Sequence, residues 1–166
     1  MSARSPENIL LRLSEREEEE VREVYAALHQ RGFPQQHQRP HISVTFALRM
    51  QPRVVEEAAA LLPPLLPARL DRVGVVVFGT KSKQTVAWLL EAPSEVDAAA
   101  RELSALNPSG RGARWVPHLT MGLRIPKSMV PDYIGALAEV TNPHFKELTA
   151  ARAVYFRPAT GEELPL

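Results

Sequence analysis

Residues 40–44 read Pro-His-Ile-Ser-Val, and residues 117–121 read Pro-His-Leu-Thr-Met. Both segments follow one pattern of proline, histidine, apolar, hydroxyl and apolar residues. Because side chains alternate between the two faces of a β-strand, the histidine and the hydroxyl share one face in each segment. The opposite faces are expected to pack against helices, and they comprise Ile42, Val44, Phe46 and Leu48 in the first strand and Leu119, Met121, Leu123 and Ile125 in the second.

The elements predicted around these two segments come in the same order twice. Apolar residues at strand or helix spacing define ten elements, and Ser14 with Glu17 forms a capping box. The first five are a strand, helix, strand, helix and strand, at about 8–13, 14–32, 41–48, 52–62 and 72–79. The second five repeat this order at about 85–90, 94–106, 117–125, 128–140 and 148–156. Each half therefore reads β-α-β-α-β.

The two halves are separated by a nearly constant offset, since His118 follows His41 by 77 positions. An ancestral duplication is the simplest explanation, and a length of 166 residues fits a single domain. We therefore expect an α+β fold in which residues 1–166 form one domain of two pseudo-symmetric lobes, about 8–80 and 84–157. Two mainly antiparallel sheets are expected to line a central cleft, with the helices outside.

Composition narrows the class of protein. Hydrophobic residues make up 45% of the chain and charged residues 23%, which is typical of a folded globular protein. The chain has no cysteine, so disulfides, thiolate catalysis and cysteine-ligated zinc are excluded. The net charge of +1 gives no global attraction to nucleic acid or to an anionic membrane. Prolines interrupt the most apolar stretch, 58–68, and we expect a cytoplasmic monomer without a membrane span.

Basic residues gather around both histidines. Residues 24–55 and 103–131 contain no Asp or Glu, although acids make up 19 of the 166 residues. Because a guanidinium binds phosphate through two hydrogen bonds, we expect Arg39, Arg114 and Arg124 to contact an anionic substrate. The alternative is compositional, since Arg outnumbers Lys 16 to 4 throughout the chain.

Two histidines without a cysteine or a neighbouring carboxylate favour acid–base chemistry. A neutral imidazole takes a proton from water and an imidazolium gives one to a leaving oxygen, so His41 and His118 suit the two tasks. The hydroxyls of Ser43 and Thr120 are placed to donate hydrogen bonds to phosphate oxygens. The pattern predicts cleavage of a phosphoester without metal or cofactor. The alternatives are strands with an ordinary polar face, or a metal site that adds His37 to the two histidines.

Aromatic side chains near the two segments are candidates for stacking on a nucleobase. We expect Phe33 and Trp115 to line the substrate site. Packing in the core is the alternative for each of them, and it is the role we predict for Phe78.

These segments resemble the signature of the two-histidine phosphoesterase superfamily, which has two copies of His-x-Ser/Thr-x in a duplicated, bilobal α+β fold. The resemblance covers essentially the whole chain. Within the superfamily the chain is most similar to the bacterial and archaeal RNA 2',3'-cyclic phosphodiesterases, historically called 2'-5' RNA ligases. Residues 39–44, which read Arg-Pro-His-Ile-Ser-Val, and the segment 73–90 carry this closer similarity.

The resemblance implies hydrolysis of 2',3'-cyclic phosphate ends of RNA to 2'-phosphomonoesters, with reversible 2'-5' ligation as a side activity. It implies that His118 is the base that activates water and that His41 is the acid that protonates the departing oxygen. Ser43 and Thr120 would hold the phosphate. The alternative substrate is a small cyclic nucleotide such as ADP-ribose 1'',2''-cyclic phosphate, and the alternative class is a nucleotide- or RNA-binding module without turnover.

Two positions depart from the family pattern. Many RNA-acting members carry an arginine five residues after the second histidine, where this chain has Leu123, and Arg124 follows one position later. The first segment is usually followed by a Phe-Leu-Gly-like turn, whereas residues 45–48 read Thr-Phe-Ala-Leu. These departures leave the two histidines and two hydroxyls of the signature in place.

Overall fold

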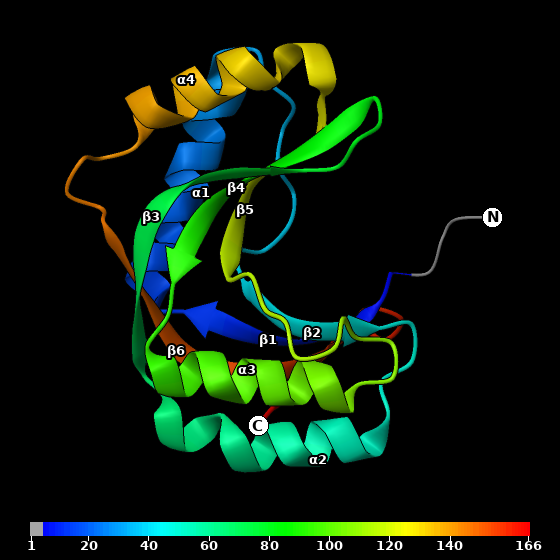
Figure 1. The fold of residues 1–166 in the computed structure, drawn as a ribbon. Coiled ribbons are helices and arrows are strands. Elements are labelled where there is room, and N and C mark those ends of the chain that lie inside the picture. The colour runs from blue at the N-terminus through cyan, green and yellow to red at the C-terminus, as the bar shows by residue number, and fades with distance from the viewer. Residues whose placement is uncertain (1–4) are drawn as a thin grey trace.

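The computed structural model describes residues 5–166 of the chain. In this range four α-helices and seven strands make up an α+β fold (Figure 1). The strands are β1 (Glu7–Leu13), β2 (Ile42–Ala47), β3 (Ala68–Phe78), β4 (Lys83–Glu91), β5 (His118–Pro126), β6 (Glu147–Arg157) and β7 (Glu162–Pro165). The helices are α1 (Glu15–Gln30), α2 (Pro52–Leu61), α3 (Ser94–Leu106) and α4 (Val130–Val140), with 3-10 turns at Pro63–Leu65 and Lys127–Met129.

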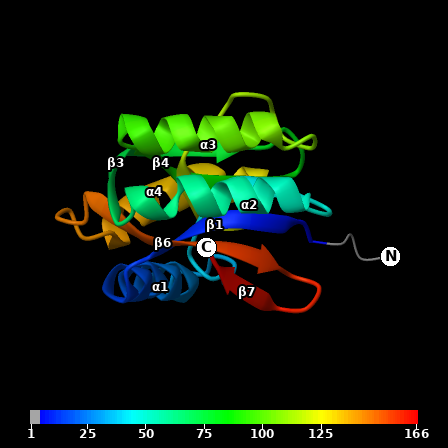
Figure 2. The ribbon, with the colours of Figure 1, turned by 90° about the horizontal axis from the view of Figure 1, so that it is seen from below.

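The strands form one sheet with the order β2-β1-β6-β3-β4-β5, and β7 pairs with β6. Their pairings are antiparallel. The expected separation into two sheets is not seen, because β3 and β6 pair directly through residues 68–71 and 147–150. The helices pack as α1 with α4 and α2 with α3, at opposite ends of the molecule in Figure 1. Figure 2 shows α2 beside α3 and β7 beside β6.

Around the two histidine segments the strand register repeats with one offset between the halves, up to a further irregularity between Gln84 and Val86 of β4. Leu10 of β1 pairs with Ser43 of β2, and Ala87 of β4 pairs with Thr120 of β5, so both members of the pair shift by 77 positions. The strand order also reads the same from its other end when β1, β2 and β3 are exchanged with β4, β5 and β6. The segments that carry the two histidines therefore occupy corresponding places in the sheet.

A β-bulge follows the hydroxyl residue in both segments. Val44 is the extra residue in β2, between the partners of Ile9 and Leu10, and Met121 is the extra residue in β5. A bulge advances one strand by a residue, so the side chains beyond it exchange faces. The predicted faces are therefore wrong beyond Val44 in β2 and at Gly122 and Leu123 in β5, whereas Ile125 is buried as predicted because a second irregularity, between Gln84 and Val86 of β4, shifts the register again.

The changed faces expose residues that were expected in the core. In β2, Thr45 is buried, whereas Phe46 is 54% exposed and Leu48 lies in the exposed turn that follows. In β5, Gly122 is buried and Leu123 is exposed. Thr45 turns inward because the amide nitrogen Nδ2 of Asn107 donates a hydrogen bond to its Oγ1 at 2.9 Å. The bulges thus place an apolar side chain on the surface next to each signature segment.

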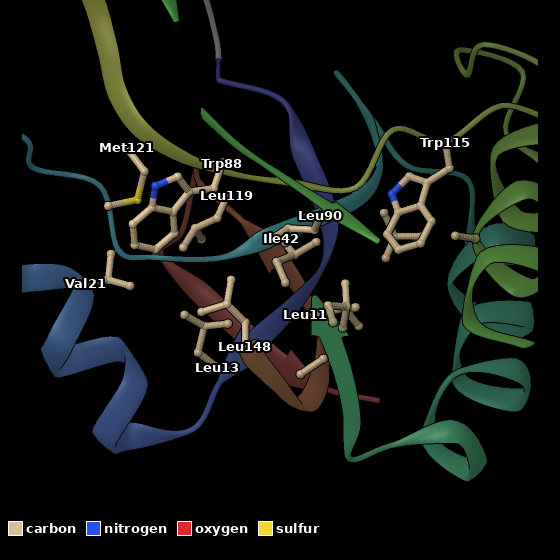
Figure 3. Close-up of a cluster of buried hydrophobic side chains, with 14 of the residues drawn as sticks. Leu11, Leu13, Val21, Ile42, Trp88, Leu90, Trp115, Leu119, Met121 and Leu148 are labelled. Carbon is tan, nitrogen blue, oxygen red and sulfur yellow. The ribbon is translucent and has the colours of Figure 1, made fainter. Parts of the chain in front are cut away.

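Both signature strands are anchored by side chains that pack into the hydrophobic core. Ile42 and Leu119, which directly follow the two histidines, are fully buried and belong to the cluster in Figure 3. Each lies opposite a buried residue of the neighbouring strand, Leu11 for Ile42 and Trp88 for Leu119. These anchors fix the backbone at the positions where the histidines leave the sheet.

Most predicted elements agree with the structure, and the differences have local causes. The Ser14 N-cap is confirmed, because Ser14 Oγ accepts a hydrogen bond from the Glu17 amide. The reciprocal half of the capping box is not formed, since the Glu17 carboxylate accepts from the Ser14 hydroxyl while the Ser14 amide donates to the carbonyl of Thr149. The third strand begins at Ala68, four residues earlier than expected. Strand β7 was not predicted, since it has four residues and ends in Pro165, which cannot donate to a ladder. Within residues 5–166, no helix is both long enough and apolar enough to cross a membrane.

Candidate active site

The two imidazoles are held in the same way. The Nδ1 atom of His41, directly before β2, lies 2.8 Å from the carbonyl oxygen of Arg39. The Nδ1 atom of His118, the first residue of β5, lies 2.8 Å from the carbonyl oxygen of Val116. A carbonyl only accepts hydrogen bonds, so Nδ1 carries the hydrogen in both rings. The neutral form of each ring therefore has its lone pair on Nε2, where it can take a proton.

The backbone beside both hydroxyl residues is tied to side chains from the other half of the chain. Trp115 Nε1 donates to the carbonyl oxygen of Ser43 at 2.9 Å, and the Tyr25 hydroxyl donates to that of Thr120 at 2.8 Å. These carbonyls lie at the bulges, where the ladder is interrupted. Asn8 Nδ2 donates to Ser43 Oγ at 2.8 Å, which leaves the Ser43 hydroxyl hydrogen free to bind another acceptor.

The surroundings lower the pKa of both histidines. Burial is the largest cause for His41, and the positive charges of Arg12 and His118 lower its pKa further. The hydrogen bond to the Arg39 carbonyl and the charge of the Glu163 carboxylate act in the opposite direction and raise it. Burial likewise lowers the pKa of His118, against its hydrogen bond to the carbonyl of residue 116. The charge of one imidazole thus acts on the other, and the neutral form of each ring is favoured.

A pocket opens beside His118, and we call it the His118 pocket. Its lining includes Phe46, Phe78, Arg111, Arg114 and Trp115. The ring of Phe78 lies 4.7 Å from the imidazole of His118, with 52° between the ring planes. Phe46 reaches this pocket because of the bulge, and Phe78 was predicted in the core. The lining of the pocket therefore combines aromatic surface, two guanidinium groups and one imidazole.

A second pocket lies beside His41, and we call it the His41 pocket. Its lining includes Asn8, Arg12, Arg39, Leu123 and Phe156. Phe156 follows Phe78 by 78 positions, and Leu123 follows Phe46 by 77, so the two pockets share the arrangement of an imidazole, an aromatic ring and a bulge-exposed apolar residue. Each imidazole thus has its own adjoining pocket.

The guanidinium of Arg39 forms ion pairs with two carboxylates. Its Nε lies 2.6 Å from Glu18, and its Nη1 lies 3.1 Å from Glu163. These carboxylates come from α1 and β7, which are distant in sequence, so the acid-free stretch 24–55 does not describe its surroundings. Arg39 lines the His41 pocket with its charge balanced, and contact with substrate stays a prediction.

The other predicted substrate residues divide between two places. Arg114 and Trp115 line the His118 pocket, with the Trp115 ring buried and its nitrogen engaged by Ser43. Arg124 lines a separate groove with residues 81–85 and contacts neither histidine pocket. Phe33 packs edge-to-face against Tyr133 at 5.1 Å, on the side of α1 and α4. Two predicted residues are therefore in the site and two are not.

The histidines are not part of a ready metal site. Across the described part of the chain, no cluster of three or more His, Asp or Glu side chains is arranged to hold a metal ion. His37 lines a different pocket, which also contains Tyr25 and His29. The arrangement of these groups does not favour the metal alternative with His37.

Comparison with models of protein families gave no match, and a search of the curated proteins also gave none.

Proposed function

We propose that this chain is a metal-independent phosphodiesterase of the two-histidine class, which opens 2',3'-cyclic phosphate ends of RNA to 2'-phosphomonoesters. The observation that carries the proposal is the repeated constellation itself. Two imidazoles at corresponding strand positions make the same Nδ1 contact, each is followed by a hydroxyl, and each adjoins a pocket with arginine and an aromatic ring. A single strand with one histidine and one hydroxyl could be a strand with an ordinary polar face. Two matched strands together supply the acid and the base that cleavage of a phosphoester needs.

We also infer that the fold is a duplication around a pseudo-two-fold axis. The nearly constant register offsets support this, because β3 and β6 correspond with a shift of 78 positions and β1 and β2 correspond to β4 and β5 with a shift of 77. Leu70 and Leu148 are separated by 78 positions and pair directly with each other. An axis that relates the halves would therefore pass between these two leucines and place the two histidine strands on either side of it.

The proposed reaction proceeds by in-line displacement at phosphorus. His118 Nε2 takes a proton from water, and the water oxygen forms a bond to phosphorus. The bond from phosphorus to the ribose O3' breaks, and protonated His41 gives its Nε2 proton to that oxygen. The hydroxyls of Ser43 and Thr120 donate to the non-bridging oxygens as their negative charge grows. With the 5'-hydroxyl of a second RNA in place of water, the same steps yield a 2'-5' linkage.

The direct test is product analysis with a short RNA that ends in a 2',3'-cyclic phosphate. The purified protein, treated with a chelator, is expected to yield one product that is heavier by one water and carries the phosphate on O2'. ADP-ribose 1'',2''-cyclic phosphate, tested in parallel, distinguishes a small-nucleotide enzyme. Activity that is lost with chelator and restored by zinc would contradict the metal-independent mechanism, and no turnover of either substrate would favour a binding module.

The rate is expected to depend on pH with a maximum on the acid side of pH 6.5. The mechanism needs one neutral and one protonated imidazole, so kcat/KM falls below the lower pKa and above the higher one. Burial lowers both pKa values from 6.5, which moves both limbs of the profile to lower pH. Measuring kcat/KM between about pH 4 and 9 checks this, and a profile still rising above pH 7 would contradict it.

Phe78 is expected to contact the nucleobase, because it lies in the His118 pocket and packs on the imidazole. Stacking on one base contributes about 1–3 kcal/mol, so Phe78→Ala should raise KM by about tenfold. Phe33→Ala provides a matched control, since that ring packs against Tyr133 outside both pockets. Equal changes of KM in the two variants, measured at a temperature where both are folded, would exclude the stacking role.

A further inference from the structure

One edge of the sheet is left open along β3. This strand pairs with β6 only through residues 68–71, and Arg72 makes the last backbone contact on that side, to Lys146. From Gly74 to Phe78 the strand pairs with β4 on its other side, with Val73 the extra residue of a β-bulge, and no backbone hydrogen bond within the described residues reaches the free side of residues 73–78. Six consecutive residues therefore present an unpaired edge.

The open edge is apolar and uncharged. Val73, Val75 and Val77 are 51%, 42% and 37% exposed, and no charged residue occurs between Arg72 and Lys81. A Cβ added at Gly74 would meet no atom within 4 Å, so the face of the strand toward which it points is also open there. Lysine or proline on an edge strand normally discourages pairing with another chain, and this stretch has neither.

The corresponding edge in the second half is covered. Residues 154–157 of β6 pair with residues 162–165 of β7, and with the shift of 78 they correspond to residues 76–79, the last three residues of β3 and the glycine that follows it. The amide of Leu166 donates to the carbonyl of Ala153 at 3.1 Å, and Ala153 corresponds to Val75. An edge of this geometry therefore accepts an antiparallel strand. By the same correspondence, the backbone carbonyl of Val75, which matches that of Ala153, points to the open side.

We propose that the open edge of β3 pairs antiparallel with the same edge of a second copy of this chain. A strand that pairs antiparallel with itself is closed by a two-fold axis, so both free edges are satisfied in one contact. Residues 73–80 bring no like charges together in such a pair. The result is a dimer with a continuous sheet across the two copies, in place of the monomer expected from the sequence.

Charge favours a second copy over an acidic partner strand. On the covered edge, β7 supplies Glu162 and Glu163, which meet arginines of the neighbouring strands. The β3 edge offers no comparable cation, because Arg72 is turned onto the ring of Trp88 and donates to the carbonyl of Phe145. A neutral, β-branched strand is the complement of this edge, and residues 73–77 of the chain are such a strand.

The first test is the dependence of mass on concentration, measured by sedimentation for the full chain and for two variants. The unmodified chain should form a dimer, and Val75→Lys should raise its dissociation constant by about tenfold or more, because each copy adds a charge to the shared edge. Leu48→Lys is the control, since it makes the same change at an exposed apolar residue outside the edge. A chain that stays monomeric at all concentrations, or an equal effect of both variants, would overturn the proposal.

The second test is cross-linking, which reports on the geometry even if Val75→Lys is poorly folded. The chain has no cysteine, so Val77→Cys introduces a single thiol on the edge. A short bifunctional maleimide should convert Val77→Cys into a covalent dimer and leave Leu48→Cys largely monomeric. Equal cross-linking of both variants, or none at Val77 in a sample that sediments as a dimer, would place the interface elsewhere and overturn the proposal.

Discussion

Replacing His41 or His118 by alanine is expected to lower turnover of an RNA 2',3'-cyclic phosphate by about 10²–10⁴-fold. Each imidazole supplies one proton transfer, and among the described residues neither histidine pocket is lined by another His, Asp or Glu side chain that could replace it. Binding should change much less, because the pockets keep their arginines and aromatic rings. The measurement is single-turnover hydrolysis together with the affinity for the uncleaved RNA.

The same variants assign the two roles through the pH profile. If His118 is the base, His118→Ala should remove the acidic limb of kcat/KM, and His41→Ala should remove the alkaline limb. His144→Ala is the control, because that side chain is exposed and outside both pockets. Turnover that survives in both active-site variants would contradict acid–base catalysis by the histidines.

The parts of the site that depend on local sequence were predictable. Strand alternation placed His41 and Ser43 on one face, and the same argument applies to His118 and Thr120. The Ser14 N-cap and the Ser94–Leu106 helix were also predicted at their observed positions. These features depend on contacts between residues close in sequence. The spacing of 77 positions between the two histidines further indicated that their strands occupy corresponding positions.

The parts that depend on distant contacts were not predictable. The bulge at Val44 leaves no mark in the apolar pattern, so Phe46 was expected in the core and is exposed. Phe78 reads as an ordinary strand residue until the fold brings it to His118. The surroundings of Arg39 are set by Glu18 and by the unpredicted strand β7, so local charge counts gave no information about its partners. A shift of 78 positions does relate Phe78 to Phe156, and this signal was available in the sequence.

Glu163 connects the fold to the position of His41. Its carboxylate pairs with Arg12, whose side chain is 3% exposed, and it also holds Arg39. Arg12 Nη1 donates to the carbonyl of Pro40 at 3.3 Å, and the carbonyl of Arg39 accepts from His41 Nδ1. The two residues before His41 are therefore positioned by the guanidinium groups of Arg12 and Arg39, which share one carboxylate from β7.

Glu163→Ala is expected to lower the free energy of unfolding by about 3 kcal/mol, the lower end of the cost of breaking a buried ion pair. The guanidinium of Arg12 would stay buried without its carboxylate, and its Nε already has no hydrogen-bond partner within the described structure. The partial exposure of Glu163, 27%, keeps the cost from being larger. Urea unfolding measures this change, and kcat should fall as well in the folded variant because Arg39 loses one of its two holders.

Glu162→Ala is the matched control in the same strand. Glu162 pairs with Arg157 on the surface, with both side chains about half exposed, and such pairs contribute about 0–1 kcal/mol. Both substitutions remove one negative charge from β7, but only Glu163→Ala removes the partner of a buried cation, Arg12. Comparing the two variants therefore isolates the effect of the buried pair. If both substitutions destabilise the protein equally, the strand rather than the buried pair carries the effect. If Glu163→Ala is stable but inactive, the carboxylate acts on the position of His41 and not on the fold.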